Sequence, residues 1–374
     1  MLYDRELHEP LTESRWSEAR VRDAIAAIVV DADAAYDAGA LWPAHVWDGY
    51  RASVPMKNLY VGAAGVVWAL ARLAQRGFET RLDLGAAARV SLERFRADPD
   101  YMAGEPAPAQ KRSGLFRGET GVAFVAWCLE RDPRLNDDLL ALVRGNIGND
   151  ANEIMWGVPG TLLVARAMHE LTVEERWAEA VFESEAAVRS ARGEDGLWTQ
   201  HLWGETFQSL SASHGLVSNV VALGEVGNAA QALRTRATVE DGYANWVEPE
   251  GRLQWCVAAP GILGHAAHYL DEDLLLAAAR LVWDAGPADA AEKGAGICHG
   301  TAGNGYALLR IFARTDDELW LERARAFAVH ALEQVERLEP RHSLFTGGLG
   351  AALFAADCLD GKPCFPILDS LEPA

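Results

Sequence analysis

Two cysteines and one histidine in this sequence could bind a metal ion. Cys298 and His299 stand side by side before Gly300, and Cys256 occupies the corresponding place before an earlier turn. Two thiolates and one imidazole make a zinc ligand set that leaves a fourth position open, which is typical of a catalytic site. A thiol bound there would lose its proton near neutral pH, whereas a free thiol has a pKa of about 8.5. These residue types therefore predict a zinc ion that prepares a sulfur nucleophile.

The turns that carry these residues repeat along the chain. A Gly-x-x-Gly pattern followed by an apolar run occurs seven times, at 62–65, 118–121, 157–160, 215–218, 258–261, 300–303 and 347–350. Ser218 and Ala258 replace a glycine in the fourth and fifth copies. Spacings of roughly 40–60 residues suit a pair of helices with its connections, so the chain is predicted to be an array of helical hairpins.

Two kinds of helix are predicted to alternate between these turns. Amphipathic stretches cover 16–36, 84–97, 136–147, 174–192, 228–240, 272–285 and 317–337. Stretches that are apolar on all sides follow the turns, around 66–71, 122–129, 161–168, 219–226, 262–270, 304–312 and 351–359. A helix that is apolar all round is enclosed, and one with a polar face is exposed to water. We therefore predict an all-α fold, an (α/α)7 double barrel of seven hairpins with the apolar helices inside.

The predicted barrel would gather residues that are far apart in the sequence. The inner helices all follow the same kind of turn, so their N-termini should meet at one rim, with positive dipole ends and unpaired N–H groups. Glu153, His214, Cys256, Cys298 and His299 all precede such turns. The repeat should therefore bring them together at a rim that favours thiolates, carboxylates and enolates.

Composition narrows the class of protein. Acidic residues outnumber basic ones by 54 to 34, giving a formal charge of −20, which argues against a nucleic-acid or anionic-membrane partner. No long uncharged apolar run and no signal-peptide pattern are found, so we expect a soluble, cytoplasmic protein. Hairpins that bury their inner faces only against their neighbours predict one domain over residues 1–374. Free cysteines are often simply buried, and we assign Cys128, Cys358 and Cys364 to the core.

At this point the sequence resembles the lanthionine synthetase C (LanC) family, and its LanC-like branch in particular. The resemblance covers nearly the whole chain and is carried by Lys293-Gly294-Ala295-Gly296-Ile297-Cys298-His299-Gly300-Thr301-Ala302-Gly303-Asn304, Gln254-Trp255-Cys256, Pro260-Gly261, Ser213-His214-Gly215, Glu153-Ile154-Met155-Trp156-Gly157 and Cys364-Phe365-Pro366-Ile367-Leu368-Asp369. The glutamate at 153, where lanthipeptide cyclases carry aspartate, and the lysine at 293 match the LanC-like branch. The altered turns at Ser218 and at Val257-Ala258 depart from the family pattern.

The resemblance implies a zinc ion held by Cys256, Cys298 and His299, and addition of a thiol to dehydroalanine or dehydrobutyrine in a peptide or protein. The thiol would be a peptide cysteine or a small thiol such as glutathione. Thiolate attack leaves an enolate that must be protonated, a role that suits His214. Glu153 could orient that imidazole, and Lys293 could offset the enolate charge or hold a carboxylate.

Other interpretations of the same residues remain open. His214 could cap a helix, Glu153 could be an ordinary acid at a helix start, and Lys293 could be a solvated side chain. The altered turns also fit a zinc-containing scaffold that binds peptides or thiols without catalysis. A glycan-processing toroid is a further alternative, but it needs paired carboxylates, and only Glu153 and Glu119 lie near the turns.

Overall fold

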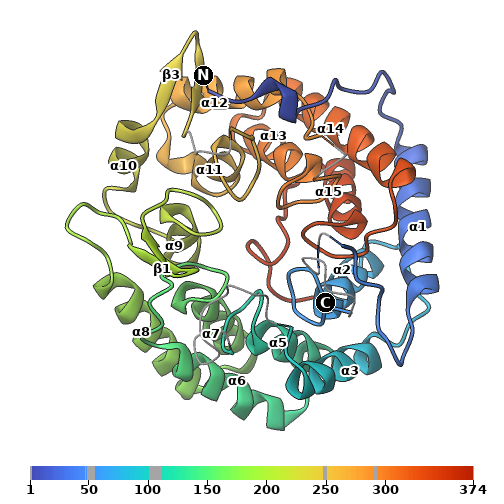
Figure 1. Ribbon diagram of the computed structural model, residues 1–374, viewed down its shortest axis with the longest axis vertical. Coiled ribbons are helices and arrows are strands. Elements are labelled where there is room, and N and C mark those ends of the chain that lie inside the picture. Colours follow the sequence, from blue (N-terminus) through green and yellow to red (C-terminus); the bar gives the residue numbers. More distant parts are fainter. Residues whose placement is uncertain are drawn as a thin grey trace.

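The predicted double barrel is confirmed by the computed structural model, which describes residues 2–46, 48, 55–100, 112–246, 251–289 and 293–373. Within these residues the chain forms 14 α-helices and two short β-hairpins. Seven helices form an inner ring, and seven others surround it (Figure 1). None of the helices in the described ranges is both long and apolar enough to cross a membrane.

The outer helices each bury one face against the inner ring. They are α1 (Glu18–Ala35), α3 (Leu84–Ala97), α6 (Pro133–Asn146), α8 (Glu175–Ser190), α10 (Ala229–Arg236), α12 (Glu272–Ala285) and α14 (Glu318–Arg337). In α1 the buried residues are Val21, Ile25, Val29 and Ala32, spaced so that they share one side of the helix. An aspartate side chain accepts a backbone N–H at the start of α3, α6, α12 and α14, which fixes where these helices begin.

The inner helices are enclosed on every side. They are α2 (Ala63–Ala74), α5 (Glu119–Glu130), α7 (Val158–Thr172), α9 (Leu216–Leu223), α11 (Ala259–Ala266), α13 (Thr301–Thr315) and α15 (Gly348–Asp360). Every residue of α5 from Glu119 to Cys128 is buried. Each inner helix begins inside its turn rather than after it, because the first residue of the pattern is the N-cap and the last lies in the first helical turn.

The second glycine of the pattern is required by a close approach of the chain to itself. A Cβ atom on Gly121 would lie 2.1 Å from the Leu115 carbonyl oxygen. The same conflict, at 1.9–2.3 Å from the carbonyl six residues earlier, recurs at Gly65, Gly160, Gly261, Gly303 and Gly350. Because a methyl group cannot fit there, the turn geometry imposes the spacing that makes the repeat visible in the sequence.

We expect Gly121→Ala to lower the free energy of unfolding by at least about 3 kcal/mol, because the methyl group forces the turn open. Gly264→Ala is the matched control, since a Cβ atom at that buried helical position meets nothing within 4 Å. The control should be stabilised by about 0.5–1 kcal/mol, the usual gain of alanine over glycine in a helix. Urea unfolding of both variants measures the difference, and equal stabilities would refute this account of the turn.

Backbone hydrogen bonds between equivalent turn residues link six of the seven turns in series. Each of these residues stands two positions before the N-cap of an inner helix. The N–H to C=O bonds run from Cys256 to Cys298 (3.3 Å), Cys298 to Phe345 (2.7 Å), Phe345 to Tyr60 (3.2 Å), Tyr60 to Phe116 (3.0 Å) and Phe116 to Met155 (3.2 Å). The bond between Phe345 and Tyr60 joins the last turn to the first. The C-terminal segment adds a second closure, because Trp68 Nε1 donates to the Leu371 carbonyl at 2.7 Å (Figure 1).

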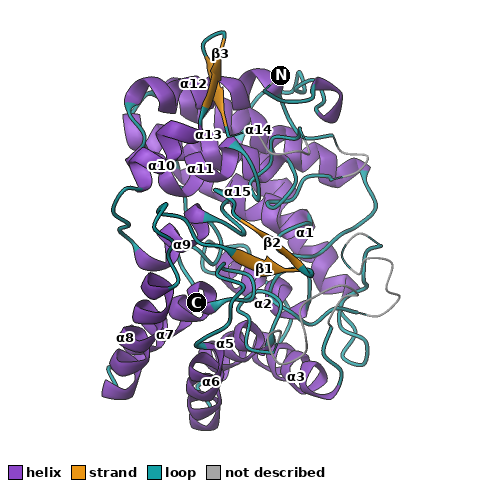
Figure 2. Ribbon diagram, turned by 60° about the vertical axis from the view of Figure 1, so that its left-hand side comes forward, coloured by secondary structure: helices purple, strands orange, loops and turns teal. Residues whose placement is uncertain are grey.

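Two β-hairpins interrupt the helical pattern and were not predicted. They are β1 (Gln200–Leu202) with β2 (Glu205–Phe207), and β3 (Thr238–Glu240) with β4 (Tyr243–Asn245), both antiparallel (Figure 2). The helix predicted over 228–240 is therefore too long: α10 ends at Arg236, and the chain continues as β3. Two 3₁₀ helices, η1 (Arg5–Leu7) and η2 (Ala267–Tyr269), complete the secondary structure of the described residues.

Candidate metal centre and active site

The three predicted metal ligands lie together at the N-terminal rim of the inner helices. One ligand atom from each of Cys256, Cys298 and His299 lies within 4.8 Å of the others. Cys298 Sγ is 3.7 Å from His299 Nε2, close to the separation of about 3.5–3.8 Å expected between two ligands of one tetrahedral zinc ion. The Cys256 N–H donates to the Cys298 carbonyl, so the two ligand turns are directly linked. Two sulfurs and one nitrogen at these separations fit a zinc ion with an open fourth position.

The environment of Cys298 favours its thiolate. Burial by itself raises the pKa of this thiol, but hydrogen bonds from Cys256, His299 and Tyr60 and the charge of the His299 imidazole bring it well below its usual value. For Cys128, Cys358 and Cys364, by contrast, burial raises the pKa. Of these four cysteines, only Cys298 has surroundings that stabilise the thiolate, the form that binds metal.

Tyr60 is a site residue that sequence reasoning missed. It lies two positions before Gly62, the place that Cys298 occupies before Gly300, and its hydroxyl hydrogen-bonds to the Cys298 sulfur. The contact joins the first turn to the sixth, so it depends on closure of the ring. We expect Tyr60→Phe to weaken zinc binding about 10- to 100-fold, as is usual when a hydrogen bond to a metal ligand is removed. Competition with a chelating dye measures this, and an unchanged affinity would show that the hydroxyl is dispensable.

Glu153 and His214, predicted as partners, form a hydrogen-bonded pair. His214 Nδ1 lies 2.9 Å from Glu153 Oε2. The carboxylate is fully buried and accepts backbone N–H groups from Met155 (2.8 Å), Trp156 (2.8 Å) and Gly157 (3.2 Å) at the start of α7. Because these bonds fix the carboxylate, Glu153 sets the orientation of the imidazole and places a proton on Nδ1 when the ring is neutral.

The pair stands where the ring of turn-to-turn bonds ends. The Met155 N–H donates to Glu153 instead of continuing the ring. On the far side, Ser213 Oγ donates to the Cys256 carbonyl at 2.9 Å, which ties the His214 turn to a metal-ligand turn. The Glu153–His214 pair therefore lies between the third and fifth turns of the barrel, next to the candidate metal centre.

Arg117 is a second residue that sequence reasoning missed. Its guanidinium carbon lies 5.6 Å from the Tyr60 ring and 5.7 Å from the Trp156 ring, and the residue is 3% exposed. A signal for it was present, because Arg117 directly precedes Gly118 just as His214 precedes Gly215. Arg117 places a buried positive charge between the Tyr60 ring, at the candidate metal centre, and the Trp156 ring, next to Glu153.

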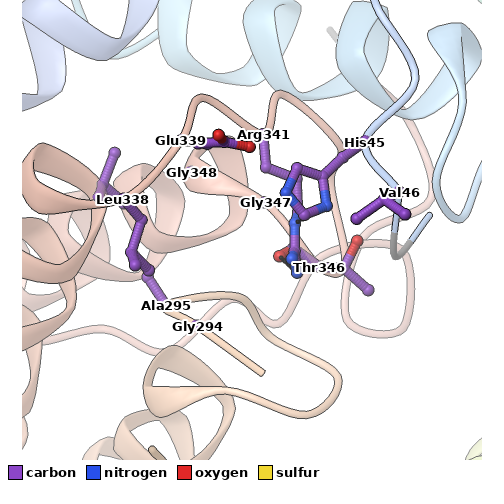
Figure 3. A pocket seen from close by; sticks show the side chains of 11 residues that line it. His45, Val46, Gly294, Ala295, Leu338, Glu339, Arg341, Thr346, Gly347 and Gly348 are labelled. Atoms are coloured by element: carbon purple, nitrogen blue, oxygen red, sulfur yellow. Dashed lines mark hydrogen bonds between the residues drawn. The ribbon is translucent and has the colours of Figure 1, made fainter. Parts of the chain in front are cut away.

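Lys293 lies on the chain that leads into the sixth turn and is half-buried. The next two residues, Gly294 and Ala295, line a cavity of about 270 Å³ with His45, Arg341 and Thr346 (Figure 3). Thr346 directly precedes the N-cap Gly347, so this cavity belongs to the same rim. The backbone of Lys293 therefore lies next to this cavity along the chain, and its role in the site stays a prediction.

The fifth turn, which departs from the glycine pattern, is held by a contact from outside it. Ala258 has φ +69° and ψ −166°, a conformation that is almost confined to glycine and is strained for alanine. The side chain of Asn245, in β4, accepts the Ala259 N–H at 2.9 Å at the start of α11. The fifth turn, which carries Cys256, is thus preserved despite its altered sequence. In the fourth turn, which is also altered, Ser218 Oγ donates to the Gly215 carbonyl at 2.8 Å.

His265 makes the stability of this region sensitive to acid. Burial lowers the pKa of His265 to about 4, while the charge of Asp369 raises it slightly and that of Arg310 lowers it slightly. Trp255 Nε1 donates a hydrogen bond to His265 Nε2 at 2.8 Å. A folded pKa below the unfolded value of about 6.5 adds stability above pH 6.5 that is lost as the pH falls towards 4. Between pH 7 and 4.5 the loss should be about 2–3 kcal/mol. His265→Gln, which keeps an acceptor for Trp255, should remove that part of the acid loss in urea unfolding, and an identical pH dependence would refute the assignment.

Comparison with known proteins agrees with this architecture. Residues 54–368 match the family described as lanthionine synthetase C-like protein. The Danio rerio protein named glutathione S-transferase LANCL1 is 30% identical over 132 residues, which cover 31% of this chain and 31% of that protein. A solved structure of nisin cyclase shares the fold, with a TM-score of 0.55 at 14% identity over 91% of this chain and 94% of that one. The chain belongs to the lanthionine synthetase C-like protein family.

Proposed function

We propose that this protein is a zinc-dependent enzyme that adds a thiol to dehydroalanine or dehydrobutyrine residues and so forms a thioether. The observation that carries the proposal is the pairing of a Cys256, Cys298 and His299 cluster with a Glu153–His214 dyad on the turn next to it. Zinc, when bound, would supply a thiolate at neutral pH. The dyad is suited to the proton transfer that such an addition requires.

The chemistry assigned to the chain is protonation at the α-carbon. Attack of the thiolate forms the C–S bond at the β-carbon and moves the π electrons into an enolate. With Nδ1 held by Glu153, the His214 imidazolium can deliver its Nε2 proton to the α-carbon and then recover a proton released by the next thiol. Arg117 and Lys293 provide positive charge for the enolate or for a substrate carboxylate.

The relatives suggest two kinds of nucleophile. Nisin cyclase points to a cysteine within the same peptide, and the name of the LANCL1 relative points to glutathione. We propose a peptide or protein with dehydroamino acids as the acceptor, acted on by residues 1–374 as one domain. None of the five cysteines, all of which lie in the described residues, is part of a disulfide. We propose a cytoplasmic location, where reducing conditions keep thiols reduced.

The proposal is tested with a dehydroalanine peptide, the zinc-loaded protein and either glutathione or an internal cysteine, with thioether formation followed by mass spectrometry. Acceleration over the uncatalysed addition with either thiol is the expected result. The strained Ala258 supports one alternative, a zinc-containing scaffold that binds the peptide or thiol. A zinc-loaded protein that binds the peptide without accelerating its reaction with any thiol would favour that scaffold.

A further inference from the structure

The tip of the β1–β2 hairpin places a tryptophan against the predicted catalytic histidine. The Trp203 and His214 rings lie 5.1 Å apart and meet edge to face at 79°. Trp156 is also stacked on this imidazole, at 6.0 Å and 18°. The two indoles are 6.0 Å apart and nearly perpendicular, so they form two walls around His214. Because Nδ1 is held by Glu153, Nε2 is the ring nitrogen left for a substrate, and both indoles pack against the ring that carries it.

The backbone at Trp203 is an unfavourable place for a large side chain. Trp203 and Gly204 form the two-residue turn of the hairpin, with φ values of +56° and +79°. Turns with two positive φ values favour Asn-Gly or Asp-Gly. The β3–β4 hairpin has the same turn with the favoured residues, Asp241 (φ +52°) and Gly242 (φ +81°). Folding of the turn therefore does not explain the tryptophan, and strain of this kind is concentrated at functional sites.

Trp203 also lies outside the core. It is 45% exposed, whereas Trp68, Trp156 and Trp255 are at most 2% exposed. Phe207, on β2, is stacked on the Trp203 ring at 6.1 Å and 2°, which holds the indole in place from behind. An exposed but rigid indole next to a functional side chain is a common anchor for a ligand, since it offers a large apolar surface at little entropic cost.

We infer that Trp203 is a substrate-binding residue whose indole packs against the dehydroamino acid of the peptide. This inference rests on the proposed function. The α,β-unsaturated residue is planar and largely apolar, so an aromatic wall suits it and would hold its α-carbon near His214. The indole would contact the substrate both before and during the reaction. Such a contact stabilises the bound substrate and the transition state alike, so it lowers KM more than it raises kcat.

The test compares Trp203→Asn with Trp203→Phe in the zinc-loaded protein. Asparagine suits the turn, so the hairpin should remain folded and Tm should not fall. We expect Trp203→Asn to raise both the Kd for a dehydroalanine peptide and KM about tenfold, with kcat within about threefold of wild type. Phenylalanine should retain most of the affinity. Asp241→Asn, in the same turn position of the other hairpin, should change neither constant.

Wild-type affinity and KM in a folded Trp203→Asn variant would overturn the inference while leaving thioether formation intact. A fall in kcat alone, with Kd unchanged, would equally overturn it, because the indole would then position His214 rather than bind substrate. A wild-type protein that binds the peptide but shows no acceleration would reject the proposed enzyme, and the Kd comparison would still decide whether Trp203 contacts the peptide. If Trp203→Asn lowers Tm, the Kd of the folded Trp203→Phe variant is compared with that of Trp203→Leu, and equal affinities would reject the aromatic contact.

Discussion

Replacement of Cys298 by alanine is expected to reduce zinc from about one ion per chain to a small fraction of that. Loss of a hydrogen bond to a ligand commonly weakens metal binding 10- to 100-fold, so loss of the ligand itself should weaken it by roughly 100-fold or more. Cys256→Ala and His299→Ala should behave alike, since the three ligand atoms form one cluster. Elemental analysis of the purified variants measures the zinc content directly.

Cys128→Ala, Cys358→Ala and Cys364→Ala are the matched controls. Burial raises the pKa of each of these thiols, so none of them is prepared to bind a metal as thiolate. Each control should keep the wild-type zinc content, although Cys128→Ala and Cys358→Ala lose buried volume and some stability. The ligand variants should also melt at lower temperature, because metal binding contributes to folding. Equal zinc in all six variants would rule out the assigned cluster.

The fold could be predicted from sequence because its main constraint is local. A carbonyl oxygen 2.1 Å from a Cβ atom at Gly121 demands glycine, and equivalent conflicts recur in five other turns. The inner helices are buried on all sides and the outer ones on one side, and the distribution of apolar residues in the sequence shows this difference. The cluster of Cys256, Cys298 and His299 followed from the same repeat, since it depends only on the position of each residue before its turn.

The surroundings of the site depend on contacts that the sequence does not record. Tyr60 reaches Cys298 only because the first and last turns meet, and the β1–β2 hairpin brings Trp203 to His214 from a connection that carries no repeat pattern. The helix predicted over 228–240 failed for a related reason. The end of that stretch is β3, and the paired strand β4 supplies Asn245 to the altered fifth turn, a tertiary contact that outweighs local helix propensity.

Replacement of His214 by alanine is expected to lower the rate of thioether formation roughly 100- to 10,000-fold, the usual contribution of a general acid or base. The zinc content should stay at the wild-type level, because His214 is not among the three clustered ligands. Measuring the rate and the zinc in the same preparation separates loss of the proton donor from loss of the metal. A His214→Ala variant that keeps both rate and zinc would refute the acid role.

Glu153→Gln refines the same prediction. A glutamine can still accept the N–H groups of Trp156 and Gly157 through its Oε1. It removes the negative charge and puts an NH2 donor where Oε2 accepts the Met155 N–H and faces His214 Nδ1 at 2.9 Å. The imidazolium that delivers the proton then loses its ionic partner. The rate of thioether formation should therefore fall, while the zinc content stays at the wild-type level. A wild-type rate in a variant that is folded and loaded with zinc would show that Glu153 only anchors the turn.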